Sequence, residues 1–122
     1  MKAAAKILVF CVAALHIWFL VLEMFLWNHP IGRNAFGLTA EDAETMAVMA
    51  ANQGLYNGFL AAGLFWGLFS EKRDIMQFFL ACIVVAGVYG GMTAKASIIW
   101  IQAAPAIIAF VLVSLSYRPK KI

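Results

Sequence analysis

Residues 6–27 read KILVFCVAALHIWFLVLEMFLW, an apolar run in which only His16 and Glu23 interrupt the stretch after Lys6. A transmembrane helix needs about 20 predominantly apolar residues to cross about 30 Å of hydrocarbon, and this run is long enough. It is also longer than the apolar region of a cleaved signal peptide, which has about 7–15 residues. The run therefore predicts a membrane-spanning helix that stays in the protein.

Three more apolar runs follow, and they are continuous rather than alternating, which favours helices over a β-barrel. The links between the last three runs are short, so neighbouring helices should be antiparallel. We expect an all-α integral membrane protein, an antiparallel four-helix transmembrane bundle that forms one domain over residues 1–122. The expected helices cover about residues 6–27, 46–69, 75–93 and 97–117.

The composition supports a lipid environment, because 65% of the residues are hydrophobic and 12% are charged. Soluble domains carry about 45–50% apolar and about 25% charged residues. The net charge of +3 is spread over the ends of the apolar runs, so no nucleic-acid surface is expected. No CxxC or HExxH spacing is present, and we expect neither a metal nor a cofactor.

Lysine and arginine side chains predict the orientation, because cytoplasmic loops carry an excess of them. Arg33 and Lys95 fall on one side of the expected bundle. The larger group falls on the other side: Lys2, Lys6, Lys72, Arg73, Arg118, Lys120 and Lys121. We therefore expect a multi-pass protein with cytoplasmic N- and C-termini.

The long loop at residues 28–45 should face outward and carry the signals that bound two helices. Pro30 should end the first helix, because proline disfavours helical conformation in the residue before it. Thr39, followed by Glu41 and Asp42, is typical of a helix N-cap with acidic residues in the first turn. The second helix should therefore begin at least one turn outside the lipid.

Polar side chains inside the expected spans are few. Glu23 lies seven residues after His16, on the same helical face, and Trp27 follows one turn later. An ionisable group at the centre of a membrane helix costs about 2.5–3.5 kcal/mol, so Glu23 is a stronger functional candidate than an amide. His16 is best explained as a hydrogen-bonded histidine of the bundle, and Trp27 as an interfacial anchor.

The polar residues of all four expected helices should lie in the outer half of the membrane. This depth predicts an outward-facing ligand pocket, with Glu23 accepting hydrogen bonds from the amides and from Tyr56 or Tyr89. His16 and Trp27 are secondary members. The principal candidates are Glu23, Asn52, Gln53, Tyr56, Asn57, Tyr89 and Gln102. The structural alternative is packing between helices, in which each such group contributes about 0.6 kcal/mol.

Small residues recur every four positions and predict close helix packing. Gly63 and Gly67 form one such pair, and Gly87 and Gly91 form another. The longest series is Ala50, Gly54, Gly58 and Ala62. We expect contacts within the chain, with a homodimer as the alternative.

Several motifs resemble a family of small bacterial membrane proteins catalogued as domain of unknown function thirteen-oh-four. They are LEMFLW at 22–27, ANQGLYNGFLAAGL at 51–64, AGVYG at 86–90 and QAAPA at 102–106. The resemblance implies a four-helix protein of the bacterial inner membrane and brings no established activity. The epimerase label that some members carry has no support here, since the chain lacks a dinucleotide-binding GxGxxG unit.

Three functions follow from these observations. The first is binding or transport of a small polar or amphipathic molecule, with Glu23 as the charged site. The second is a membrane-embedded enzyme for a lipophilic substrate, with Glu23 and either His16 or Tyr56 as acid and base; no catalytic motif identifies a reaction. The third is a structural or assembly subunit.

Overall fold

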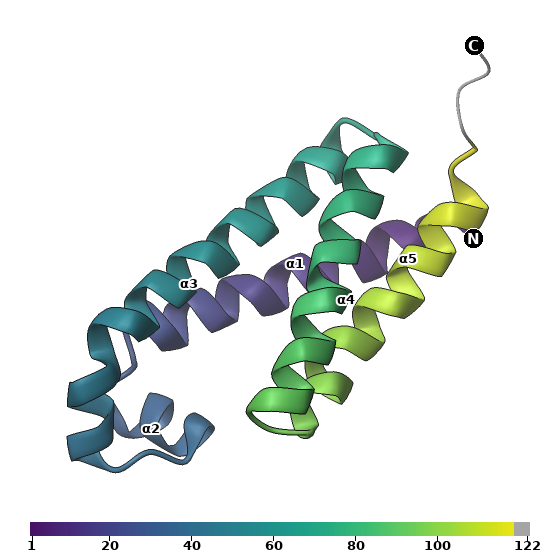
Figure 1. The fold of residues 1–122 in the computed structure, drawn as a ribbon. Helices are drawn as coiled ribbons and strands as arrows, with labels where there is room; N and C mark the ends of the chain where they lie inside the picture. The colour runs from purple at the N-terminus through teal and green to yellow at the C-terminus, as the bar shows by residue number, and fades with distance from the viewer. Residues whose placement is uncertain (119–122) are drawn as a thin grey trace. The chain divides into compact units, whose positions relative to one another are not determined.

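The computed structural model describes residues 1–118, which are helical throughout apart from short turns (Figure 1). The all-α prediction is therefore confirmed for this range. Lys120 and Lys121, predicted to be cytoplasmic, lie outside the described residues. The helices are α1 (Lys2–Met24), α2 (Pro30–Phe36), α3 (Ala40–Phe69), α4 (Arg73–Thr93), the π-helix η1 (Ile99–Ala103) and α5 (Ala104–Ser116).

Three helical segments in this range are long and apolar enough to cross a membrane: Lys2–Met24, Arg73–Thr93 and Ile99–Ser116. The last of these joins η1 to α5. The predicted second span, residues 46–69, lies in α3, which is 30 residues long but carries three amide side chains near its middle. α3 is not one of the three segments, and its crossing of the membrane stays a prediction.

The chain forms two compact units, and their boundaries fall inside α1 and α3. Unit 1 holds residues 1–13 and the chain from residue 62 onward, and unit 2 holds residues 14–61. Each unit is described separately below.

In unit 2, α1 and α3 run antiparallel, because Leu20 lies against Gly58 and the later residue Glu23 lies against Gly54. The α3 residues that are buried here follow one another at intervals of three, four or seven positions. They are Ala43, Ala50, Gly54, Asn57 and Ala61. This spacing is the heptad pattern of helices that pack along a common seam, and we call the contact the α1–α3 seam.

The loop between α1 and α3 contains α2, a helix that was not predicted. The ring of His29 accepts a hydrogen bond from the Ile31 amide (3.1 Å), and Pro30 opens the helix, a position that suits its fixed φ. Gly37 ends it in a left-handed conformation with φ 65°. The predicted cap of the next helix is confirmed, since the Asp42 amide donates to Thr39 Oγ1 at 3.1 Å.

In unit 1, α4 packs antiparallel to η1 and α5, and Figure 1 shows α4 and α5 side by side. Gln77 Nε2 donates to Ser114 Oγ at 2.8 Å near one end of the pair. Near the other end, a Cβ at Gly87 would come within 2.7 Å of the Ala103 amide nitrogen. The predictions of antiparallel neighbours and of close packing at glycines are confirmed here.

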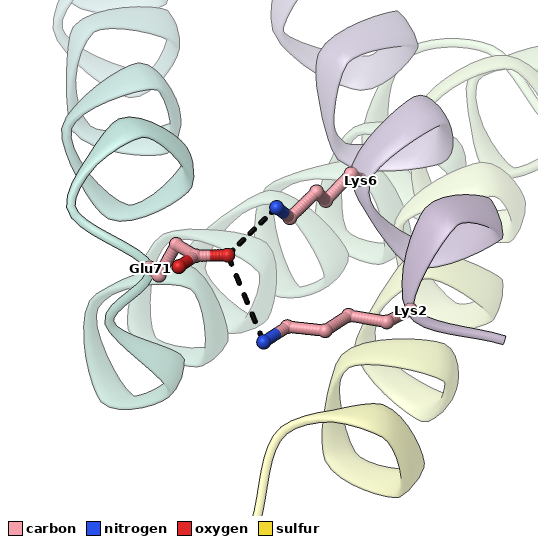
Figure 2. Close-up of polar contacts among 3 residues, drawn as sticks. All are labelled: Lys2, Lys6 and Glu71. Atoms are coloured by element: carbon pink, nitrogen blue, oxygen red, sulfur yellow. Dashed lines mark ion pairs between the residues drawn. The ribbon is translucent and has the colours of Figure 1, made fainter.

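The turn between α3 and α4 places a glutamate where glycine is usual. Glu71 has φ 52°, and the amides of Glu71 and Lys72 bond back to the carbonyls of Leu68 (3.3 Å) and Gly67 (3.0 Å). Its carboxylate faces two lysines of α1, as Figure 2 shows. Lys6 Nζ lies 2.6 Å and Lys2 Nζ 3.7 Å from Glu71 Oε1.

The predicted fourth helix at 97–117 contains an irregular turn. Over Ile99–Ala103 the backbone is π-helical, and the Ala104 amide bonds to the Ile99 carbonyl five residues earlier. Pro105 follows directly and has no amide hydrogen to donate. Gln102 therefore lies in a wider turn than the sequence predicted.

Candidate functional site

A buried polar pair occupies the α1–α3 seam of unit 2. Asn57 Nδ2 donates a hydrogen bond to Glu23 Oε1 at 2.6 Å. Both residues are largely excluded from the surface, with 8% of Glu23 and 7% of Asn57 exposed. The site residues that the structure joins directly are therefore one carboxyl group and one carboxamide.

The heptad spacing explains why these two side chains meet. Glu23 follows the fully buried His16 by seven residues on α1, and Asn57 lies on the buried series of α3. Gly54, nearly one turn before Asn57, leaves space for the carboxylate side chain: a Cβ there would lie 3.0 Å from Glu23 Cβ. The glycine thus permits the close helix approach that the 2.6 Å bond needs.

The other candidates on α3 do not share this environment. Asn52, Gln53 and Tyr56 are exposed. Asn52 Nδ2 donates to the Val48 carbonyl of its own helix at 2.9 Å, and the Tyr56 ring lies edge-on to Phe59 with centroids 5.9 Å apart.

The prediction that the amides of α3 donate hydrogen bonds to Glu23 is met by one of them, Asn57. As amides, Asn52, Gln53 and Asn57 had equal weight in that prediction, although only Asn57 falls in the series of buried residues Ala43, Ala50, Gly54 and Ala61. The hydrogen bond to Glu23 comes from Asn57 rather than from Tyr56. The spacing of Ala50, Gly54 and Ala61 in the sequence is the signal that identifies Asn57.

The secondary candidates are both buried in unit 2. The His16 ring meets the Phe19 ring edge-on, with centroids 5.2 Å apart. The indole Nε1 of Trp27 donates to the Ala43 carbonyl at 2.9 Å and its ring packs on Phe36, so Trp27 ties the end of α1 to the first turn of α3. Its predicted role as an anchor at the membrane interface stays a prediction.

Tyr89 and Gln102 belong to unit 1. Tyr89 is 70% exposed on α4, where it lines a shallow apolar hollow with Phe78, Cys82 and Val85. Gln102 is partly buried in η1. Their predicted part in a ligand site with Glu23 stays a prediction.

The Glu23–Asn57 pair can bind a hydrogen-bond donor or a cation. An ionised carboxylate offers about four acceptor positions, and Asn57 occupies one of them. The aliphatic neighbours are the Met24 side chain, which lies against Gly54, and the Leu20 side chain, which lies against Gly58; they suit a ligand with apolar groups. Within residues 1–118, no group of three His, Cys, Asp or Glu side chains is placed to hold a metal ion.

Residues 10–114 match the family model described as "Protein of unknown function (DUF1304)". The chain belongs to this family. The resemblance seen in the sequence is therefore confirmed. Within the family, the chain is similar to the uncharacterized protein YpaA of Lactococcus lactis subsp. lactis, with 30% identity over 109 residues, or 86% of this chain and 92% of the relative. No solved structure matches this chain.

Proposed function

We propose that this chain is a four-span protein of the bacterial inner membrane that binds a small polar or amphipathic molecule through Glu23. The three long apolar helices support the membrane location, and α3 supplies the fourth span in this proposal. The observation that carries it is the buried hydrogen bond between Glu23 and Asn57.

The presence of a carboxyl group rather than a second amide in the α1–α3 seam supports a binding role for Glu23. Two amides could form a similar inter-helix hydrogen bond without the cost of placing a carboxyl group in a membrane. A carboxylate adds a negative charge and further acceptor positions. Amphipathic cations and hydrogen-bond donors are the ligands that match both properties and the aliphatic groups of Leu20 and Met24.

The proposed orientation has both termini in the cytoplasm. The cytoplasmic side then carries Lys2, Lys6 and the Lys72–Arg73 pair, and the outer side carries Arg33 and Lys95. This distribution is the one that the positive-inside rule favours. Glu23, at the end of α1 far from Lys2, lies toward the outer face in this arrangement. Because a four-helix unit is small for a transporter, transport would require a second copy of the chain.

The test is binding and uptake of tetraphenylphosphonium, an amphipathic cation, by the full chain reconstituted in lipid vesicles. We expect Glu23→Gln to weaken binding by about tenfold or more, since it removes the charge. Asn52→Ala is the matched control, because the Asn52 amide bonds only its own helix among the described contacts. Equal binding by the parent and by Glu23→Gln, for this probe and for neutral amphipathic amides, would overturn the proposal.

The membrane-enzyme alternative receives less support from the geometry. That alternative pairs Glu23 with His16 or Tyr56 as acid and base, whereas the side chain that hydrogen-bonds Glu23 at 2.6 Å is the non-titrating amide of Asn57. Comparing lipid extracts of a deletion strain and its parent would reveal an altered lipid if this alternative were right. The structural-subunit alternative predicts that Glu23→Gln changes stability and no binding property.

A further inference from the structure

A second polar site lies at one end of unit 1 and shares no residue with the site proposed above. It is a hollow of about 880 Å³ formed where the start of α1, the turn between α3 and α4, and the end of α5 come together. Its lining residues are Lys2, Ser70–Asp74 and Ser116–Arg118.

The hollow is basic. Lys2, Lys72, Arg73 and Arg118 line it together with two carboxylates, those of Glu71 and Asp74. Glu71 is already engaged, because Lys6 and Lys2 both approach the same carboxylate oxygen (Figure 2). Among residues 1–118, Lys72 and Arg118 have no carboxylate within ion-pair distance, so their positive charge remains available to a ligand.

Three polar atoms of the lining residues are buried and have no hydrogen-bond partner within the described part of the chain. They are Arg73 Nε, Ser116 Oγ and the Tyr117 hydroxyl. Tyr117 is only 6% exposed, and burial raises the pKa of its phenol, so the hydroxyl keeps its proton at neutral pH. Buried polar groups are nearly always bonded, and leaving one unpaired costs about 1–3 kcal/mol.

All three atoms can donate a hydrogen bond. An oxyanion with several acceptor oxygens would therefore satisfy them together, while the free lysine and arginine charges neutralise it. Arginine, with its planar set of donors, is well suited to phosphate. The hollow also lies at the ends of three segments that are long and apolar enough to cross a membrane, which is the depth of lipid headgroups.

We propose that this hollow binds a phosphate group, with Arg73, Ser116 and Tyr117 as hydrogen-bond donors and Lys72 and Arg118 as the charges around it. The phosphate belongs either to the headgroup of an anionic lipid or to a free phosphate compound. The site is independent of Glu23, so neither proposal depends on the other.

The test uses the purified full chain in a neutral detergent. Native mass spectrometry measures the apparent Kd for phosphatidylglycerol, with phosphatidylcholine, a zwitterionic lipid without net charge, as the comparison. Calorimetry measures the Kd for inorganic phosphate. We expect Tyr117→Phe and Arg73→Gln each to raise the Kd by about tenfold, because each removes a hydrogen bond to a charged group. Tyr89→Phe is the matched control, since Tyr89 is an exposed tyrosine on α4.

The measurements with phosphatidylglycerol and with inorganic phosphate distinguish a lipid headgroup from a free phosphate compound as the ligand. Loss of phosphatidylglycerol binding alone in the two variants identifies a headgroup site, and loss of inorganic phosphate binding identifies a site for free phosphate compounds. Without ligand, Tyr117→Phe should be at least as stable as the parent, because it removes an unpaired buried hydroxyl. The proposal fails if neither ligand binds, or if Tyr117→Phe and Arg73→Gln both bind as tightly as Tyr89→Phe.

Discussion

Asn57 reaches across the α1–α3 seam and donates a 2.6 Å hydrogen bond to the carboxylate of Glu23. The two residues are 34 positions apart in the chain, so the bond also fixes how α1 and α3 are aligned lengthwise. A single polar residue in an otherwise apolar seam can specify helix register. The pair therefore serves the fold as well as the proposed ligand site, and stability and binding must be measured separately.

Removing the Asn57 amide should lower the stability of the fold more than neutralising the Glu23 carboxylate does. We expect Asn57→Ala to lower the free energy of unfolding in detergent micelles by about 1–3 kcal/mol, since it leaves a buried carboxyl without its donor. Glu23→Gln keeps an acceptor oxygen and should cost less. The control is Asn52→Ala, whose effect should stay within about 0.5 kcal/mol; comparable losses at Asn52 and Asn57 would contradict this account of the seam.

Two glycines of α3 should respond differently to the same substitution. At Gly54 a Cβ would meet Met24 Cγ at 2.7 Å, Glu23 Cβ at 3.0 Å and the Leu20 carbonyl oxygen at 3.2 Å. At Gly58 the close contact is the end of one flexible side chain, Leu20 Cδ1 at 2.7 Å. We expect Gly54→Ala to destabilise by about 1–3 kcal/mol and Gly58→Ala by clearly less, as measured by unfolding in the same micelles.

Trp27 should stabilise the fold through the hydrogen bond that its indole N–H donates. Trp27→Phe keeps a large ring beside Phe36 but removes the hydrogen bond to the Ala43 carbonyl, so a loss of about 1 kcal/mol is expected. Trp100→Phe is the comparison, because Trp100 is 75% exposed and should change little. Limited proteolysis between residues 28 and 39 gives a second readout, and only Trp27→Phe should speed cleavage there.

Acid should weaken the contact between α1 and the α3–α4 turn. The hydrogen bond from Lys6, followed by the charges of Lys2 and Lys6, holds the pKa of Glu71 below its ordinary value of 4.5. A carboxylate with a lowered pKa stabilises the fold above its unfolded pKa, and this contribution is lost as the pH falls through the folded pKa. The pairs are exposed, so the effect is small.

The measurement is Tm at neutral pH and below about pH 4 for the parent and for Glu71→Gln. The parent should be the more stable protein at neutral pH, and the two Tm values should converge in acid. Glu71→Gly separates the charge from the backbone, since glycine adopts the φ of 52° without strain. A gap between parent and Glu71→Gln that widens in acid would show that this pair does not stabilise the fold.

The sequence predicted the helical class, the antiparallel neighbours and the cap at Thr39 because each depends on local or averaged chemistry. It did not predict α2, since seven residues opened by Pro30 and closed by Gly37 resemble an irregular loop. Of the residues predicted around Glu23, the structure shows Asn57 bonded to it, and the part of the other residues in a ligand site stays a prediction. Which side of α3 faces α1 depends on tertiary packing. The buried side is the one that carries the small residues Ala50, Gly54 and Ala61, and the polarity of Asn52 or Tyr56 does not indicate it.

The wide turn at Ile99–Ala103 has an evolutionary consequence. A π-helical hydrogen bond spans five residues where an α-helical one spans four, so η1 holds one residue more than a regular turn would need. Deleting one residue there would let the segment close as ordinary α-helix while α5 kept its alignment with α4. Relatives that differ from this chain by a single-residue gap are therefore expected to carry it near Gln102, where the fold can absorb a change in length.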